Sequence, residues 1–374
     1  MNLASSDADP LHAGMPRINR GEPQLAHFEF WPPGVIYFPV FVFWALQSIR
    51  HGSLTLPTAA NPGLPAGGLC GESKSEVLAA AGPVARQWIA PFTMIKKCSG
   101  PAAIAETKAA ALQAMQAAGL AFPVVGKPDI GCRGAGVRAL RNEQALDEYL
   151  KLFPEGTNLI LQKMIDVEGE AGVFYVRYPD EERGHIPSLT LKYFPRVVGD
   201  GKRTLEELIL DDPRASKIAP VFLKRHKARL HEVLGIGERF RLVFSGNHAR
   251  GTIFRNGTLL VTEALRARID EIAQDIKGFH FGRFDIRFAD FGAFLDGRDF
   301  TVLEFNGAGA EQTHMWDSTH RLRDAYRIMF DQYGTLWNVA AANRRRGAKP
   351  TPLGELFHRF MQEQKLTRLY PSTE

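Results

Sequence analysis

Cysteine is scarce in this sequence of 374 residues, and apolar runs of membrane-spanning length are missing. The three cysteines, Cys70, Cys98 and Cys132, form no CxxC pair, and one of them has no partner in any disulfide arrangement. We therefore expect reduced thiols and a cytoplasmic protein rather than a disulfide-stapled secreted domain. The first 24 residues are polar and contain proline, so we expect no secretory signal there.

One apolar stretch, residues 35–49, raises the question of membrane contact. It is too short to span a bilayer, and Pro39 interrupts it. The pattern favours a buried strand followed by a helix. Attachment to a membrane surface stays open as the alternative, because Arg50 and His51 follow directly.

The rest of the composition is typical of a globular protein, with 45% hydrophobic and 23% charged residues. Lysine and arginine number 46 against 41 acidic residues, which gives a formal net charge of +5. This mild excess suits an anionic ligand such as a nucleotide, or an anionic surface, without choosing between them. Nucleic-acid binding is not expected, because the basic segment 223–231 has no interleaved aromatic residues and is explained by a helix with a solvated face.

Helical and strand patterns alternate along the chain, without repeats or low-complexity tracts. We expect an α+β protein with mainly antiparallel sheets. The tail is expected to be loose apart from one amphipathic helix near 353–365. The expected parts are a disordered N-terminus at 1–24, a short N-terminal region at 25–69, lobes at about 70–157 and 158–340, and a basic tail at 341–374.

Two strand patterns, GRFDIRF and TVLEFNG, place polar residues on one face and apolar residues on the other. Arg283, Asp285 and Arg287 share a face of the first strand, as Glu304 and Asn306 do in the second. If the strands pair antiparallel, two carboxylates and an amide oxygen converge, which is a ligand set for Mg²⁺ beside substrate phosphates. Mutual neutralisation of these charges within the strand pair is the alternative.

A glycine-rich loop follows Lys127 in the stretch VVGKPDIGCRGAGV. Its glycines, Gly131, Gly134 and Gly136, let backbone N–H groups turn toward phosphate oxygens, and the lysine can offset phosphate charge. The loop has neither the Gly-Lys-Ser/Thr of a Walker A motif nor the GxGxxG of kinases and dinucleotide folds. A simple turn is the alternative.

A third motif, LILQKMIDVEGE, is an apolar strand that ends at a polar turn. Such a segment can offer backbone groups to a purine edge and a carboxylate to ribose hydroxyls. A polar hairpin turn explains the same residues equally well.

Taken in this order, the motifs resemble those of the ATP-grasp superfamily over about residues 70–340. The pattern is most similar to D-alanine–D-alanine ligases and related carboxylate–amine ligases, and VVGDGKRTLEELI is similar to a segment of cyanophycin-synthetase-type members. The resemblance implies two α+β lobes that clasp ATP.

The resemblance also implies roles for individual residues. Lys163 and Ile165 would present backbone groups to adenine, and Glu170 would bind ribose. Gln162 stands where the family usually has an acidic hinge residue. The full implied ATP-binding set comprises two phosphate-contacting lysines, three lid glycines and the hinge: Lys74, Lys127, Gly131, Gly134, Gly136, Gln162, Lys163, Ile165 and Glu170.

The remaining implied roles concern metal and chemistry. Asp285, Glu304 and Asn306 would hold Mg²⁺, or alternatively Mn²⁺. Arg283 would face the transferred phosphoryl group, and Lys192 matches a lysine on the mobile flap of the family. The implied reaction joins a small-molecule carboxylate to an amine through an acyl phosphate. A nucleotide-binding protein without ligase activity, or one that transfers phosphate to another acceptor, is the alternative.

The sequence departs from the D-alanine ligases on both sides of these motifs. The region before residue 70 is short and divergent, and AGAEQTHMWD follows LEFNG where those ligases have a Pro-Gly-Met type segment. D-alanine is therefore not expected as the substrate. Candidate substrate residues form two polar sets: Asn247, His248 and Arg250, and Glu311, His314 and Asp317. A surface loop and a histidine with structural partners are the alternatives. A homodimer also stays open.

Overall fold

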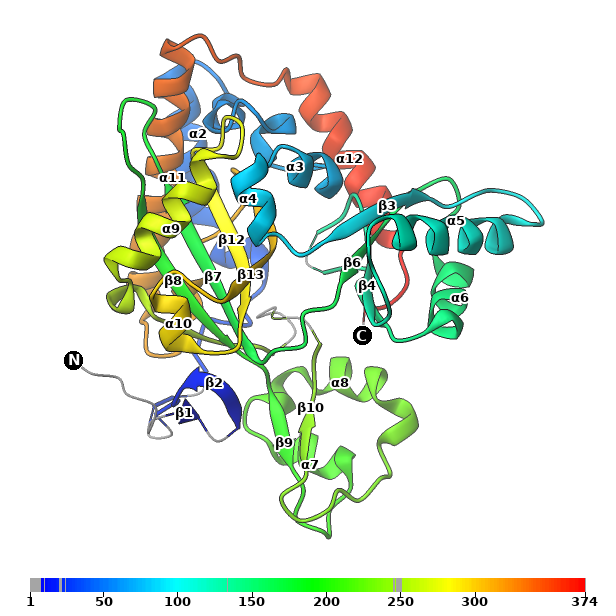
Figure 1. Cartoon of the computed structure of the whole chain (residues 1–374). Coiled ribbons are helices and arrows are strands. Elements are labelled where there is room, and N and C mark those ends of the chain that lie inside the picture. The colour runs from blue at the N-terminus through cyan, green and yellow to red at the C-terminus, as the bar shows by residue number, and fades with distance from the viewer. Residues whose placement is uncertain are drawn as a thin grey trace.

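Two antiparallel sheets form the framework of the chain over the residues that the structure describes (Figure 1). The computed structural model describes residues 8–9, 11–19, 22–23, 25–132, 134–244, 246 and 251–373. Each large sheet carries its own helices and its own apolar core, so the predicted α+β class in two lobes is confirmed.

The first lobe is a four-stranded sheet covered by two helices. The strand order is β3 (Phe92–Lys96), β6 (Asn158–Lys163), β4 (Val124–Pro128) and β5 (Arg138–Leu140), and the helices are α5 (Ala103–Ala117) and α6 (Glu143–Leu152). Asn142 caps α6, as its position before an amphipathic run predicts. Because β6 pairs with both β3 and β4, the lobe extends to Lys163, and the expected boundary at 157/158 is wrong.

The second lobe is a five-stranded sheet with helices on both faces. The order is β11 (Ile253–Asn256), β8 (His185–Tyr193), β7 (Gly169–Val176), β12 (Phe281–Phe288) and β13 (Phe300–Asn306). Alternation along β7 sends Val173 and Tyr175 into the core with α9 (Glu263–Gln274), and Phe174 and Val176 into the core with α11 (Leu322–Arg345).

A small third lobe is inserted between β8 and β11, and the sequence did not predict it as a separate unit. It contains β9 (Arg196–Val198), α7 (Leu205–Asp211), α8 (Ala219–Arg225) and β10 (Arg239–Arg241) around its own apolar cluster. A capping box of Thr204 and Glu207 opens α7.

The N-terminal region packs on the second lobe. Residues 12–16 form strand β2, so the expectation of disorder is wrong for that segment. Residues 35–49 are helical in α1 (Pro33–Ile36) and α2 (Phe38–His51), and no part of the run is a strand. Leu56 and Ala60, just beyond α2, are buried with α11 in the second core.

None of the helices in the described part of the chain combines the length and the apolarity needed to cross a membrane.

The C-terminal residues are fixed against both lobes, so the expectation of a loose tail is wrong. After α11, helix α12 (Leu353–Leu369) includes the predicted amphipathic segment. The Glu363 carboxylate accepts a hydrogen bond from the N–H of Gly71 at 2.9 Å, and Tyr370 stacks on Phe153 of the first lobe. Short helices α3 (Lys74–Ala79) and α4 (Pro83–Trp88) complete the connection between the lobes.

Candidate active site

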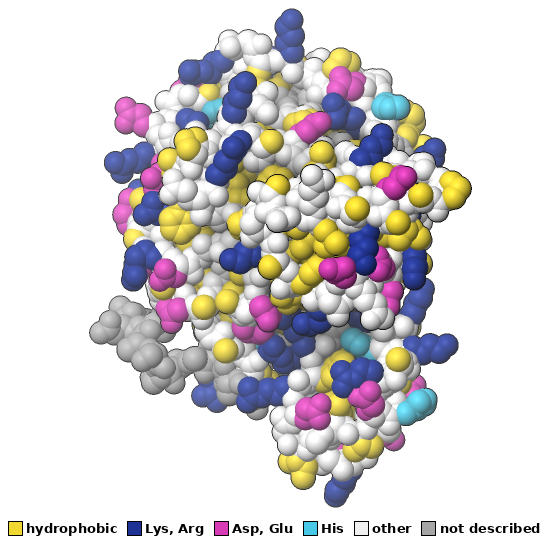
Figure 2. Space-filling model, turned by 45° about the vertical axis from the view of Figure 1, so that its right-hand side comes forward, with side chains coloured by type: hydrophobic (Ala, Val, Ile, Leu, Met, Phe, Trp, Pro, Cys, Tyr) yellow, Lys and Arg dark blue, Asp and Glu magenta, His cyan; other side chains and the backbone are white. Residues whose placement is uncertain are grey.

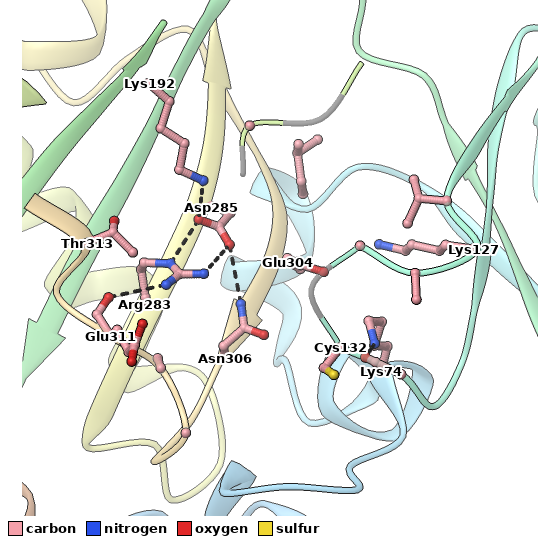
Figure 3. Close-up of a pocket in the computed structure, with 18 of the residues that line it drawn as sticks. Lys74, Lys127, Cys132, Lys192, Arg283, Asp285, Glu304, Asn306, Glu311 and Thr313 are labelled. Atoms are coloured by element: carbon pink, nitrogen blue, oxygen red, sulfur yellow. Dashed lines mark hydrogen bonds and ion pairs between the residues drawn. The ribbon is translucent and has the colours of Figure 1, made fainter. Parts of the chain in front are cut away.

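A cavity of about 650 Å³ lies where the lobes meet. Figure 3 shows Lys74 and Lys127 on one side of it and Lys192, Arg283 and Asp285 on the other, with Glu304 between the two groups. The hollow above the small third lobe is visible in Figure 2, with Lys and Arg side chains gathered around it. The cavity thus brings together side chains from segments that are far apart in the sequence.

The predicted pairing of the two polar strands is present in the second sheet. β12 and β13 are antiparallel, and their register sets Asp285 opposite Glu304 and Arg283 opposite Asn306. The register shifts after Asp285, and Leu303 lines the cavity. The polar residues of both strands thus face the cavity, but the expected separation from apolar residues is incomplete in β13, where Val302 and Phe305 are in the core and Leu303 is not.

Asp285 is the electrostatic centre of this face. Its Oδ1 accepts hydrogen bonds from Lys192 Nζ at 2.8 Å and Arg283 Nε at 3.0 Å. Its Oδ2 accepts from Arg283 Nη2 at 3.0 Å and Asn306 Nδ2 at 3.3 Å. Burial by itself raises the pKa of Asp285, but Arg283 and Lys192 more than offset it, so the pKa lies well below its ordinary value.

The oxygen atoms on this face can bind a hard divalent cation only if a substrate supplies further oxygen ligands. Within the residues that the structure describes, no three His, Cys, Asp or Glu side chains are grouped to hold a metal ion. Two carboxylates and the Asn306 amide oxygen, completed by phosphate oxygens, match the way Mg²⁺ is usually bound. The Asp285 carboxylate already accepts hydrogen bonds from Lys192 and Arg283. Glu304, by contrast, has no hydrogen bond or ion pair among the residues that the structure describes.

Glu170 lies beside this centre on the middle strand. Its Oε1 is 3.1 Å from Lys192 Nζ, and its Oε2 is 2.9 Å from Arg287 Nε. Burial raises the pKa of Glu170, but Lys192 and Arg287 more than offset this and leave it lowered. The ribose contact predicted for Glu170 would therefore share oxygens already paired with two cations.

The opposite wall carries the predicted phosphate loop. Gly134 and Gly136 have φ values of 70° and 71°, in the left-handed region that favours glycine. Lys74 Nζ donates to the carbonyl oxygen of Gly131. Lys127 is buried, and burial lowers the pKa of its ammonium group to about 8. These groups lie together as the sequence predicted.

Gln162 lies where the two lobes join. Its Oε1 accepts from Lys127 Nζ at 2.8 Å, and its Nε2 donates to the carbonyls of Ala90 at 3.2 Å and Leu303 at 3.1 Å. Only an amide can both accept from the lysine and donate to two carbonyls. This accounts for glutamine where the resemblance leads one to expect an acid.

The expected adenine-binding edge follows directly along the chain. The N–H of Lys163 donates to Pro91 O at 2.8 Å, so this amide is already used. Ile165 lines the cavity, and its N–H donates no hydrogen bond within the described part of the chain. A backbone donor at Ile165 therefore remains for a ligand.

Sequence reasoning missed three carboxylates of the cavity: Glu29, which pairs with Arg214, and Glu72 and Glu363. Burial, with a contribution from Glu304 and Glu363, raises the pKa of Glu72 to about 7, against the opposing effect of Lys74. Glu72 stands two residues before the predicted Lys74, so its position was a signal that could have been used. Glu363 lies on α12, and nothing in the sequence around it indicates that it lines the cavity.

The segment before α2 forms the other end of the cavity, which the sequence also did not predict. Phe30, Trp31 and Tyr37 line it, and the Tyr37 hydroxyl donates to Glu311 Oε1 at 2.6 Å. This end is aromatic, whereas the end near Lys127 is strongly charged.

The remaining candidate substrate residues have different outcomes. Asn247, His248 and Arg250 fall outside the described residues. The buried His314 pairs through Nδ1 with Ser188 Oγ at 2.6 Å, and Asp317 accepts from the N–H of Asn256 at 2.6 Å. Both contacts tie loops to the sheet, so these two side chains have structural partners.

No protein-family model matches this chain, and no curated protein does. Among solved structures, it is similar to a D-alanine–D-alanine ligase from Bacillus anthracis, at 13% identity and a TM-score of 0.39, covering 73% of this chain and 71% of that one. It is similar to the VanG D-Ala:D-Ser ligase from Enterococcus faecalis at 14% identity and a TM-score of 0.39, covering 71% and 61%.

A bifunctional glutathione synthetase from Pasteurella multocida matches at 15% identity and a TM-score of 0.34, over 69% of this chain and 36% of that one. The chain thus spans less than two thirds of the length of the synthetase and of the VanG ligase. All three identities are 15% or lower, and all three TM-scores are below 0.4. At such scores the function has to be argued from the site itself.

Proposed function

We propose that this chain is an ATP- and Mg²⁺-dependent carboxylate–amine ligase of the ATP-grasp type. One observation carries the proposal: Lys74, Lys127 and the glycine loop face the Arg283–Asp285–Glu304 group across a single cavity. Cations and loop amides on one wall suit a polyphosphate, and carboxylates with an arginine on the other suit phosphoryl transfer to an acid.

The residues of the chain would divide the work by position. Lys74, Lys127 and the loop amides would hold the phosphates of ATP, and Ile165 would donate its N–H to adenine. Glu304 and Asn306 would hold Mg²⁺, with Asp285 joining them once Lys192 or Arg283 moves to the substrate. When bound, Mg²⁺ supplies charge neutralisation at the transferred phosphoryl group.

Arg283 would then act on the second half of the reaction. Its Nη1 donates to the Glu311 carbonyl at 3.2 Å, so its guanidinium is held at the junction of the charged and aromatic ends. There it would stabilise the oxyanion that forms when an amine attacks the acyl phosphate. The bond from carbon to the phosphate oxygen breaks, and an amide, ADP and phosphate result.

The acceptor end of the cavity supports a substrate other than D-alanine. Phe30, Trp31 and Tyr37 supply a large aromatic wall for which a methyl side chain offers little contact. Glu311 beside Tyr37 would suit the protonated amine of an acceptor before it is deprotonated.

The test is a screen for Mg²⁺-dependent ADP release with pooled carboxylates and amines. The proposal expects release only when one carboxylate and one amine are both present. Release with a single hydroxyl acceptor would replace ligase activity with phosphoryl transfer to that acceptor.

A nucleotide-binding protein without acyl transfer is the second candidate. The observation that favours it is that both carboxylate oxygens of Asp285 are already paired with cations. This candidate predicts that ATP raises the melting temperature although no acceptor pool releases ADP.

A further inference from the structure

Helix α2 is apolar on the side that faces solvent as well as on the side that packs on the protein. Its inner side is fixed against α11 (Figure 1): the Phe43 ring lies 5.4 Å from Phe330, and Trp44 lies 5.4 Å from Trp337. The outer side is a stripe at helical spacing whose larger side chains are 45–79% exposed: Phe38, Phe41, Val42, Leu46 and Ile49. We call this stripe the α2 apolar face.

The chain on either side of α2 extends this face. Trp31 and Val35 precede the helix and are 39% and 55% exposed, and Leu54 follows it at 50%. The helix FPVFVFWALQSIRH contains no acidic residue and no lysine. Large exposed apolar side chains gathered in one short stretch of the chain mark an interaction site more often than scattered single residues do.

Arginines stand at the C-terminal end of the α2 apolar face. Arg50 is in the last turn of the helix and is exposed. Arg344 Nη1 donates to the carbonyl of His51 at 3.0 Å, which places the end of α11 beside the end of α2. Arg345 follows on α11 and is exposed as well.

Arginines also stand near the N-terminal half of the face. Arg323 and Arg327 are exposed, and their spacing of four and then three residues puts them on the side of α11 that carries Phe330. Phe330 contacts Phe43, so this side borders α2. Two acidic residues stand beside them: Asp324, whose Oδ1 lies 3.6 Å from Arg323 Nε, and Asp331, which follows Phe330 on an adjoining side of the helix. Arg327 has no such ion pair among the described residues.

We propose that the α2 apolar face docks on an anionic lipid surface. Phenylalanine, leucine and isoleucine side chains would enter the boundary between headgroups and acyl chains, with Trp31 at the headgroup level. The arginines at both ends would meet lipid phosphates, an attraction that is strongest at low ionic strength. Charge argues against a second copy as occupant, because a symmetric dimer brings the same arginines toward one another.

Docking in this way concerns the cavity as well. Trp31, Pro33, Ile36 and Tyr37 line its aromatic end, and the chain runs from them directly into α2. The lipid surface would therefore lie close to the acceptor end. Lipid binding needs no turnover, so its test is independent of ligase activity.

The experiment is flotation of the full chain with vesicles of phosphatidylglycerol and phosphatidylcholine, and with vesicles of phosphatidylcholine alone. The variants are Phe41→Glu and Leu46→Glu, in exposed positions where the fold does not need the side chain. Leu259→Glu and Ile236→Glu are matched controls, because these residues are 99% and 88% exposed elsewhere on the molecule. Circular dichroism verifies that each variant is folded.

We expect binding to the anionic vesicles that weakens with salt and falls about tenfold or more in either α2 variant, while both controls bind as wild type does. Wild type that floats with neither vesicle overturns the proposal. So does equal loss in the controls. A dimer seen by sedimentation, dissolved by Phe41→Glu and accompanied by no vesicle binding, assigns the face to a second copy instead.

Discussion

The hydroxyl of Tyr370 donates a hydrogen bond to the carbonyl of Ile130 at 2.7 Å, although the two residues are 240 positions apart. Thr373 Oγ1 reaches Gly134 O at 2.6 Å in the same way. The end of the chain therefore holds the glycine loop from outside, at the wall where we place the phosphates of ATP.

Removing this hold should weaken ATP binding. Tyr370→Phe deletes one hydrogen bond and keeps the ring on Phe153, so we expect the Kd for Mg·ATP to rise about fivefold. Tyr370→Ala should raise it further, since the edge of the ring also lies beside Gly131. Titration calorimetry measures both. Leu369→Ala, at an exposed neighbour, should bind as wild type does; unchanged affinity in Tyr370→Ala would show that the contact does not order the loop.

Substitutions at Lys192 and Glu304 should have different effects, one on the stability of the fold and the other on turnover. Lys192 is buried between Glu170 and Asp285, so Lys192→Met leaves both carboxylates short of a cation and should cost about 3–5 kcal/mol of unfolding free energy. Glu304→Gln removes no contact of the described structure and should change stability by about 0.5 kcal/mol or less, yet abolish Mg²⁺-dependent turnover. Urea unfolding and ADP release test the two variants together. A folded Glu304→Gln protein with near-wild-type turnover contradicts the metal assignment.

Glu72 should make stability depend on pH in the absence of nucleotide. Its folded pKa, about 7, lies above the ordinary 4.5, so its stabilising contribution is complete below pH 4.5 and is lost as pH rises through 7. Relative to wild type, Glu72→Gln should gain up to about 3 kcal/mol of unfolding free energy between pH 4.5 and pH 8. Glu76→Gln, at an exposed site in helix α3 four residues further along the chain, is the control. Parallel pH curves for wild type and Glu72→Gln would contradict the raised pKa.

The sequence predicted the polar centre because its signal is local. GRFDIRF and TVLEFNG alternate between unlike faces, and one antiparallel register brings Asp285 opposite Glu304. The glycine loop could also be predicted, because the left-handed φ values at Gly134 and Gly136 favour glycine, and the glycines are visible in the sequence.

Contacts between distant segments left no such trace. Glu363 reaches Gly71 across 292 positions, and no periodicity encodes that meeting. Residues 35–49 were misjudged for a different reason. The sequence of α2 is apolar on every side of the helix, and this pattern predicts a buried helix. In the structure, however, Phe41 and Leu46 face solvent. The third lobe was missed because its strands are only three residues long.

The central claim is that a carboxylate is activated as an acyl phosphate in this cavity. With the acid and amine identified by the ADP screen, the most direct measurement follows ¹⁸O from a labelled carboxylate by mass spectrometry of the products. The account predicts ¹⁸O in the released phosphate, because the amine displaces phosphate together with the carboxylate oxygen that attacked ATP. Unlabelled phosphate, or label in AMP, would contradict it.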